Sequence, residues 1–155
     1  MPATAGSESR LHLLVIDDDA LQRMIVREVA AKHEFETTGA ASYEEAADLL
    51  GHSDYDCVVL DLHLGGRSGL DVLELFKEVR CNAPILLMSG AEEDVRQMAQ
   101  EVGIKAQLNM ITPMPKPVDL RVLSETLARI RLAERPREKI TFAGWTADSV
   151  RYIYA

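Results

Sequence analysis

The chain has 155 residues, of which 47% are hydrophobic and 27% are charged, values that suit a folded domain and exclude a disordered chain. Its formal net charge of −8 argues against nucleic acid or an anionic membrane surface as a direct partner. Cys57 and Cys81 match no disulfide or metal-binding spacing, so we expect reduced thiols and a cytoplasmic location.

Residues 11–131 alternate between strand and helix patterns, which predicts a single domain. Apolar runs predict strands over 11–16, 35–38, 57–60, 84–88 and 106–111. Capping residues and helical periodicity predict helices over 19–32, 43–50, 68–80, 92–102 and 119–131. Gly51 and Gly103 are expected to end the second and fourth of these helices. Residues 1–10 are small and polar, and we expect a disordered lead-in that is neither a signal peptide nor a membrane span.

The strands near residues 14–16, 58–60 and 85–88 are continuously apolar, as strands covered on both faces must be. Strict alternation of strand and helix therefore predicts an α/β fold, with a parallel sheet between two layers of helices. In such sheets, ligands bind beyond the carboxyl ends of the strands.

Acidic side chains follow two of the predicted strands. Asp17, Asp18 and Asp19 come directly after the first strand, and Asp61 follows the third. Carboxylates so placed would repel one another, so a proton or a hard cation must balance them, and Mg²⁺ prefers such oxygen ligands. Ser89 and Lys116 are predicted to reach the same rim. Carboxylates, a hydroxyl and an ammonium group together suit phosphoryl transfer.

Several short motifs make the chain resemble the receiver domain of bacterial two-component response regulators, of the single-domain type. They are VIDDD at 15–19, VVLD at 58–61, GL at 69–70, ILLMSGA at 85–91 and KP at 116–117. The resemblance covers residues 11–131. It implies a flavodoxin-like, doubly wound, five-stranded parallel sheet of order 2-1-3-4-5, in three layers.

The resemblance also implies roles for individual residues. Asp61 would accept a phosphoryl group from a histidine kinase or histidine phosphotransfer protein. Mg²⁺ would be held by Asp17, Asp18, Asp61 and the backbone carbonyl of His63, while Asp19 is expected only to cap a helix. The domain would then signal to a downstream protein target. It would not be an enzyme beyond its own phosphorylation and dephosphorylation.

Two further roles follow from the resemblance. Ser89 would hydrogen-bond the bound phosphoryl group, and Lys116 would pair with it. The peptide bond between Lys116 and Pro117 is expected to be cis, which is plausible because the second residue is proline.

The chain departs from the family pattern at several positions. Gly65 stands where the family usually has proline, and Ser68 where it often has aspartate. Pro113 stands where an aromatic residue usually precedes the lysine by three positions. Because proline cannot rotate as that aromatic does, we expect output to depend on movement of residues 90–115 as a whole.

Residues 132–155 form a tail too short for a DNA-binding domain, yet it holds four of the chain's eight aromatic residues. We expect it to dock, because so many large apolar groups are rarely left in water. A homodimer through the 90–115 face or this tail is a further expectation.

Three other functions compete with phosphoacceptance. A haloacid-dehalogenase-like phosphatase would use Asp17 as its nucleophile, but it needs a further acidic pair after Lys116, and Asp61 would have no role. A flavin carrier on the same fold lacks the Gly/Ser/Thr-rich phosphate cradle. A degenerate receiver would bind partners without phosphorylation.

Overall fold

A computed structural model describes residues 10–90 and 92–133 of the chain. A central sheet of five parallel strands has the order β2-β1-β3-β6-β7. Its strands are β1 (Leu11–Ile16), β2 (Phe35–Ala40), β3 (Cys57–Leu60), β6 (Ile85–Ser89) and β7 (Met114–Pro115). The helices are α2 (Ala20–Ala31), α3 (Tyr43–His52), α4 (Gly69–Glu78), α5 (Glu93–Lys105) and α6 (Leu120–Ala133). Counted along the chain, the main-sheet strands follow the predicted order 2-1-3-4-5, so the flavodoxin-like fold is confirmed.

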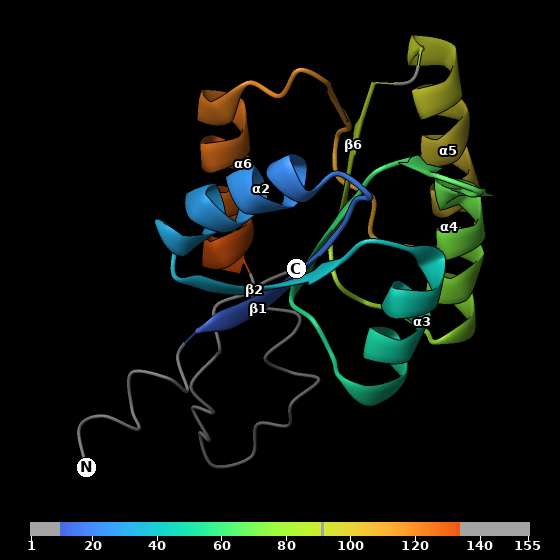
Figure 1. Ribbon diagram of the computed structural model, residues 1–155, viewed down its shortest axis with the longest axis horizontal. Coiled ribbons are helices and arrows are strands. Elements are labelled where there is room, and N and C mark those ends of the chain that lie inside the picture. Colours follow the sequence, from blue (N-terminus) through green and yellow to red (C-terminus); the bar gives the residue numbers. More distant parts are fainter. Residues whose placement is uncertain (1–9, 91, 134–155) are drawn as a thin grey trace, which may run out of the picture.

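Helices cover both faces of the sheet and bury a separate apolar core on each. Helices α2 and α6 lie together on one face, while α3, α4 and α5 line the other (Figure 1). Alternate residues of β1 divide between the cores: Leu14 and Ile16 face α3 to α5, whereas Leu13 and Val15 face α2 and α6. This division explains why residues 13–16 of β1 and all of β3 are continuously apolar.

The helix starts lie where capping residues predict them. Asp19 accepts a hydrogen bond from the Leu21 N–H, and Ser42 accepts one from the Glu45 N–H, at the starts of α2 and α3. Ser68 caps α4 in the same way through the Leu70 N–H. Local side-chain chemistry therefore fixes where these helices begin.

Both glycines predicted to end helices lie inside them, so those predictions are wrong. Helix α3 continues through Gly51 to His52, and α5 continues through Gly103 to Lys105. Gly103 is instead a close-packing residue, because a Cβ there would lie 2.4 Å from the sulfur of Met110. A glycine beside a packed side chain is needed for space, which a helix-ending pattern cannot distinguish.

The fifth strand is displaced from its predicted place at 106–111. Only Met110 of that range pairs with the sheet, in an isolated bridge to Ile85, and β7 itself begins at Met114. Residues 85 to 88 span three steps along β6, while their partners 110 to 114 span four, so one extra residue bulges from the edge. Pro113 and Pro115 suit such an edge because they have no N–H to pair.

A second, two-stranded antiparallel sheet follows β3. It is a hairpin of β4 (His63–Leu64) and β5 (Arg67–Ser68), joined at Gly65 and Gly66. This hairpin links the end of the central strand β3 to the start of α4, beside the carboxyl edge of the sheet.

The predicted lead-in over 1–10 and tail over 132–155 lie outside the described residues, except Arg10 and the last two residues of α6. Docking and dimerisation through the tail therefore stay predictions. Among the helices within 10–90 and 92–133, none has the length and apolar character needed to cross a bilayer.

Candidate functional site

The two predicted acidic positions meet because β1 and β3 are neighbours in the sheet. Ile16 pairs with Leu60 in parallel register, so the next residues, Asp17 and Asp61, leave the sheet side by side. The Asp61 N–H donates to the Ile16 carbonyl at 2.9 Å, which continues the ladder to the start of the site. The carboxyl edge of two central strands thus delivers both carboxylates to one place.

Three carboxylates gather at this edge. Asp17, Asp18 and Asp61 each offer an oxygen, and these oxygens all lie within 4.8 Å of one another. Asp17 and Asp61 are buried, while Asp18 is exposed. We call these three residues the acidic cluster.

The side chain of Lys116, which follows the edge strand β7, contacts the acidic cluster. Its Nζ donates to Asp17 Oδ2 at 2.8 Å and to Asp61 Oδ2 at 3.1 Å. The lysine follows β7, and its backbone N–H donates to the Ser89 carbonyl at 3.1 Å. The peptide bond from Lys116 to Pro117 is cis, as the resemblance implied.

Burial and charge shift the pKa values of two of these groups. Burial raises the pKa of Asp17, and hydrogen bonds from Lys116 and the Asp19 N–H oppose that effect. For Lys116, burial works to lower the pKa, but the bonds and charges of Asp17 and Asp61 outweigh it and raise the pKa. The ammonium group is therefore held firmly in its charged form between two carboxylates.

Further contacts fix the orientation of Asp17. Its Oδ1 accepts the Asp19 N–H at 2.9 Å, and its carbonyl accepts Arg23 Nη1 at 2.7 Å. The side chain of Asp19 is used in capping α2, as expected. The sequence patterns gave no indication of the Arg23 contact, because it joins a helix side chain to a backbone carbonyl.

The remaining predicted residues lie at the same rim. Ser89 is the last residue of β6, the strand beside β3, and it is fully buried. The His63 N–H donates to Asp61 Oδ1 at 3.1 Å, so the residues that follow Asp61 help to orient its carboxylate. The proposed metal contact of the His63 carbonyl stays a prediction.

The β4–β5 hairpin next to the acidic cluster was not predicted. The sequence HLGGRS at 63–68 carries the signal, because two glycines between short paired segments favour a tight hairpin turn. Gly65 has a φ of +63°, a value that glycine adopts without strain. What the sequence cannot give is where the hairpin lies relative to Asp18.

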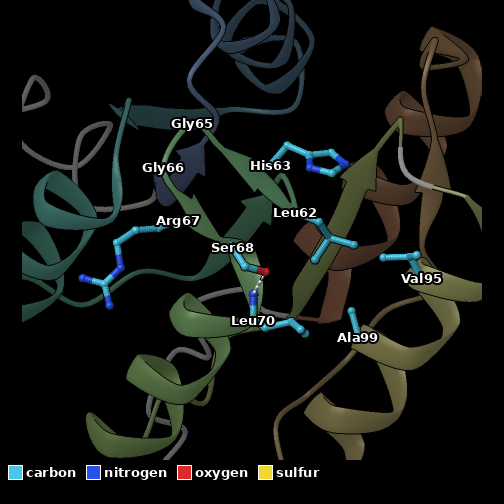
Figure 2. A pocket seen from close by; sticks show the side chains of 9 residues that line it. All are labelled: Leu62, His63, Gly65, Gly66, Arg67, Ser68, Leu70, Val95 and Ala99. Atoms are coloured by element: carbon cyan, nitrogen blue, oxygen red, sulfur yellow. Dashed lines mark hydrogen bonds between the residues drawn. The ribbon is translucent and has the colours of Figure 1, made fainter.

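A cavity of about 390 Å³ lies between this hairpin, the start of α4, and α5. Figure 2 shows the Leu62, Val95 and Ala99 side chains gathered around it, with Arg67 pointing away on the opposite side of the hairpin. Arg67 extends instead to the ring of Tyr43 at the start of α3.

The acidic cluster fits a divalent cation. Three carboxylate oxygens from separate residues, close enough to share one ion, form the donor set that Mg²⁺ and Ca²⁺ prefer. Two of the three carboxylates are buried, and Lys116 alone among the described cations contacts them directly. An oxygen-seeking ion would complete the balance of charge.

Comparison with known protein families identifies the family of the chain. A family model described as the response regulator receiver domain matches residues 13–128. The chain belongs to this family. It is 33% identical over 161 residues to the regulatory protein VirG of Agrobacterium fabrum, in an alignment covering 93% of this chain and 60% of VirG. The chain thus spans less than two thirds of that relative's length.

Solved structures share the receiver fold. A response regulator from Colwellia psychrerythraea matches with a TM-score of 0.70 and 22% identity, over 79% of this chain and 97% of that one. A response regulator protein from Burkholderia pseudomallei, solved with a phosphorylated aspartic acid, a calcium ion and citrate, matches with a TM-score of 0.63 and 20% identity. That alignment covers 85% of this chain and 77% of the other. At these identities the similarity concerns the fold alone.

Proposed function

We propose that this receiver domain accepts a phosphoryl group on Asp61 from the phosphohistidine of a histidine kinase or a histidine phosphotransfer protein. The observation that supports it most is the placement of a buried Asp61 carboxylate beside two other acids and in contact with Lys116. A carboxylate in this setting has a fixed orientation and a cation beside it. The fixed orientation favours its use as a nucleophile, and the cation can balance the charge of the incoming phosphoryl group.

The reaction is a transfer between two protein side chains. A carboxylate oxygen of Asp61 forms a bond to phosphorus while the bond from phosphorus to the histidine nitrogen breaks, and that nitrogen keeps the electron pair. Lys116, now 3.1 Å from Asp61, would move with the charge and pair with a phosphoryl oxygen. Ser89, at the end of the neighbouring strand, would donate its hydroxyl to another oxygen.

The cation expected here is Mg²⁺, held by Asp17, Asp18, Asp61 and the His63 carbonyl. When bound, it would neutralise phosphoryl charge that the carboxylates would otherwise repel. The Burkholderia pseudomallei structure contains both a phosphorylated aspartic acid and a calcium ion, which supports a role for a divalent cation in this fold. The contacts of Lys116 with Asp17 and Asp61 support the same proposal, because they show that these carboxylates already attract a positive charge.

Signalling would follow through protein contacts on the face formed by residues 90–115. Helix α5 leaves Val95, Met98 and Ile104 exposed there, by 38%, 48% and 58%. Such side chains suit a partner protein, either a downstream target or a second copy of the chain. We expect this segment to show the largest change in amide exchange on phosphorylation. Larger changes elsewhere, with none here, would contradict the proposed route.

Intact-mass analysis after incubation with Mg²⁺ and acetyl phosphate tests phosphoacceptance. The wild type should gain one phosphate, and Asp61→Asn should gain none. Asp48→Asn is the matched control, because Asp48 is an exposed carboxylate of α3 whose side chain is 75% exposed. An adduct that persists in Asp61→Asn would contradict the proposal, and one mapped to Asp17 would favour the phosphatase alternative.

A further inference from the structure

The β4–β5 hairpin is fixed at its base by backbone contacts. It begins two residues after Asp61 and ends at Ser68, the residue that caps α4. The Gly69 N–H donates to the Leu62 carbonyl at 2.8 Å, which closes the loop at its base. Leu64 is buried in the core that α3, α4 and α5 share.

The tip of the hairpin reaches the acidic cluster. A Cβ placed on Gly65 would lie 4.0 Å from Asp18 Oδ2, so the turn passes directly beside the exposed carboxylate of the cluster. His63, on the first strand of the same hairpin, bonds Asp61 through its N–H. Movement of the hairpin would therefore change the surroundings of two of the three acids.

Arg67 ties the hairpin to the start of α3. Its guanidinium lies 3.7 Å from the centre of the Tyr43 ring. The same group pairs with Asp71 at 3.4 Å and with Glu44 at 3.9 Å. Figure 2 shows this side chain extended away from the cavity, on the opposite side of the hairpin from Val95 and Ala99. A planar cation on an aromatic ring, with carboxylates at its edge, gives one preferred position.

We propose that Arg67 is a positioning residue for the cation site: stacked on Tyr43, it holds the β4–β5 hairpin against the acidic cluster. This inference rests on the proposed function, because it assumes that the cluster binds a divalent ion with help from the hairpin backbone. It means that contacts at the first turn of α3 influence how tightly the acidic cluster binds a cation, a dependence that the sequence did not indicate. A partner that contacts Tyr43 or Glu44 would thereby change how well the receiver binds its ion.

Charge and position predict opposite effects of removing Arg67. Loss of a cation near a cation site strengthens metal binding if simple electrostatics dominates. Loss of the stacking contact frees the hairpin and weakens metal binding if Arg67 acts by position. The sign of the change in affinity therefore separates the two explanations.

The test is a titration with Mn²⁺, followed by the electron paramagnetic resonance signal of the free ion, with Mg²⁺ competition to confirm the site. For Arg67→Ala we expect metal binding about three- to fivefold weaker, the scale of one exposed cation–π contact. Tyr43→Leu, which keeps apolar bulk but removes the ring, should weaken binding to a similar extent. Tyr43→Phe keeps the ring face and should bind as the wild type does.

Two controls separate position from charge and from folding. Arg121→Ala removes the same charge from a side chain that is 88% exposed on α6, and it should leave affinity unchanged. The double variant Arg67→Ala/Tyr43→Leu should be no weaker than either single variant, because both remove one contact. Melting curves of all variants should show that each is folded at the temperature of the titration.

The outcomes distinguish this inference from the proposed function. If the wild type binds no Mn²⁺ and gains no phosphate, the proposed function itself fails. If the wild type does both, while Arg67→Ala binds Mn²⁺ equally or more tightly, only the positioning role is overturned. Weak binding by Tyr43→Phe, equal to that of Tyr43→Leu, would also overturn it.

Discussion

Two glycines show how differently two regions of this receiver are built. At the rim beside the acidic cluster, a Cβ on Gly69 would lie 2.7 Å from the Leu62 Cα and 2.8 Å from the Asp61 carbonyl oxygen. Next to the sheet edge, a Cβ on Gly103 of α5 would lie 2.4 Å from the sulfur of Met110, which bridges to β6. The first contact is with backbone, which cannot rotate away, and the second is with the end of a flexible side chain. Close packing at the rim is therefore against backbone, while close packing near the edge is against a side chain that can adjust.

The rest of each region agrees with this contrast. At the rim, β1 and β3 pair in unbroken register up to the acids. At the edge, the pairing of β6 with the segment before β7 contains an extra residue. A site that binds an ion needs fixed ligands, and a surface that responds to phosphorylation needs two arrangements of similar energy.

The largest effect is expected at the rim, from Gly69→Ala. The added methyl would overlap backbone atoms of Leu62 and Asp61, so the start of α4 must move away from β3. We expect a loss of about 3–4 kcal/mol in the free energy of unfolding, at the upper end for overpacking, because no side chain can rotate to relieve the overlap. Urea denaturation measures it. A loss as small as that of an edge variant would contradict close packing against backbone at the rim.

The second-largest loss of stability is expected from a substitution of Lys116, which connects the edge strand β7 to the acids at the rim. Lys116→Met leaves the buried carboxylates of Asp17 and Asp61 without their cation, and we expect a loss of about 2–3 kcal/mol. Added Mg²⁺ should raise the melting temperature of this variant more than that of the wild type, because the ion replaces the missing charge. Equal responses to Mg²⁺ would contradict a shared site.

The pH dependence of this effect has a defined sign. The folded state raises the pKa of Lys116 above its ordinary value of 10.5. A raised pKa gives stability that is complete below the ordinary value and is lost as pH rises through the folded value. The difference in unfolding free energy between wild type and Lys116→Met should therefore be constant near pH 7 and shrink above pH 10.5.

The rim was predictable from sequence because its rules are local. The acids follow apolar strands directly, and parallel strands end at one edge, so Asp17 and Asp61 could be placed together without coordinates. Capping by Asp19, Ser42 and Ser68 was likewise readable from side-chain type. The hairpin at 63–68 could have been found from its two glycines, but its contact with Asp18 depends on tertiary packing.

The edge was not predictable because its geometry depends on partners distant in sequence. The run at 106–111 is apolar enough for a strand, yet only Met110 forms a bridge to β6, since an extra residue and Pro113 intervene before β7. Gly103 reads as a helix end, and only the position of Met110 reveals its packing role. Tertiary contacts override local propensity at such places.

A smaller effect is expected from Gly103→Ala at the edge. The Met110 side chain must shift to accept the methyl group, so we expect a loss of about 1–2 kcal/mol in unfolding free energy. In a Met110→Ala background the overlap is gone, and the same substitution should be neutral or stabilising. Denaturation of the four proteins in this cycle measures the coupling. A loss unchanged by Met110→Ala would place the strain elsewhere.

The smallest effect, of opposite sign, is expected from Gly51→Ala in α3. Gly51 also lies inside a helix, but a Cβ there would meet nothing within 4 Å. The substitution should stabilise the fold by about 0.5–1 kcal/mol, because alanine restricts the unfolded chain and favours helix. Thermal melting measures the gain, with Gly103→Ala as the matched helical glycine. Destabilisation by Gly51→Ala would mean that backbone conformation, and not the neighbouring atoms, decides the effects of Gly51→Ala and Gly103→Ala. The contrast between rim and edge could then no longer be explained by packing.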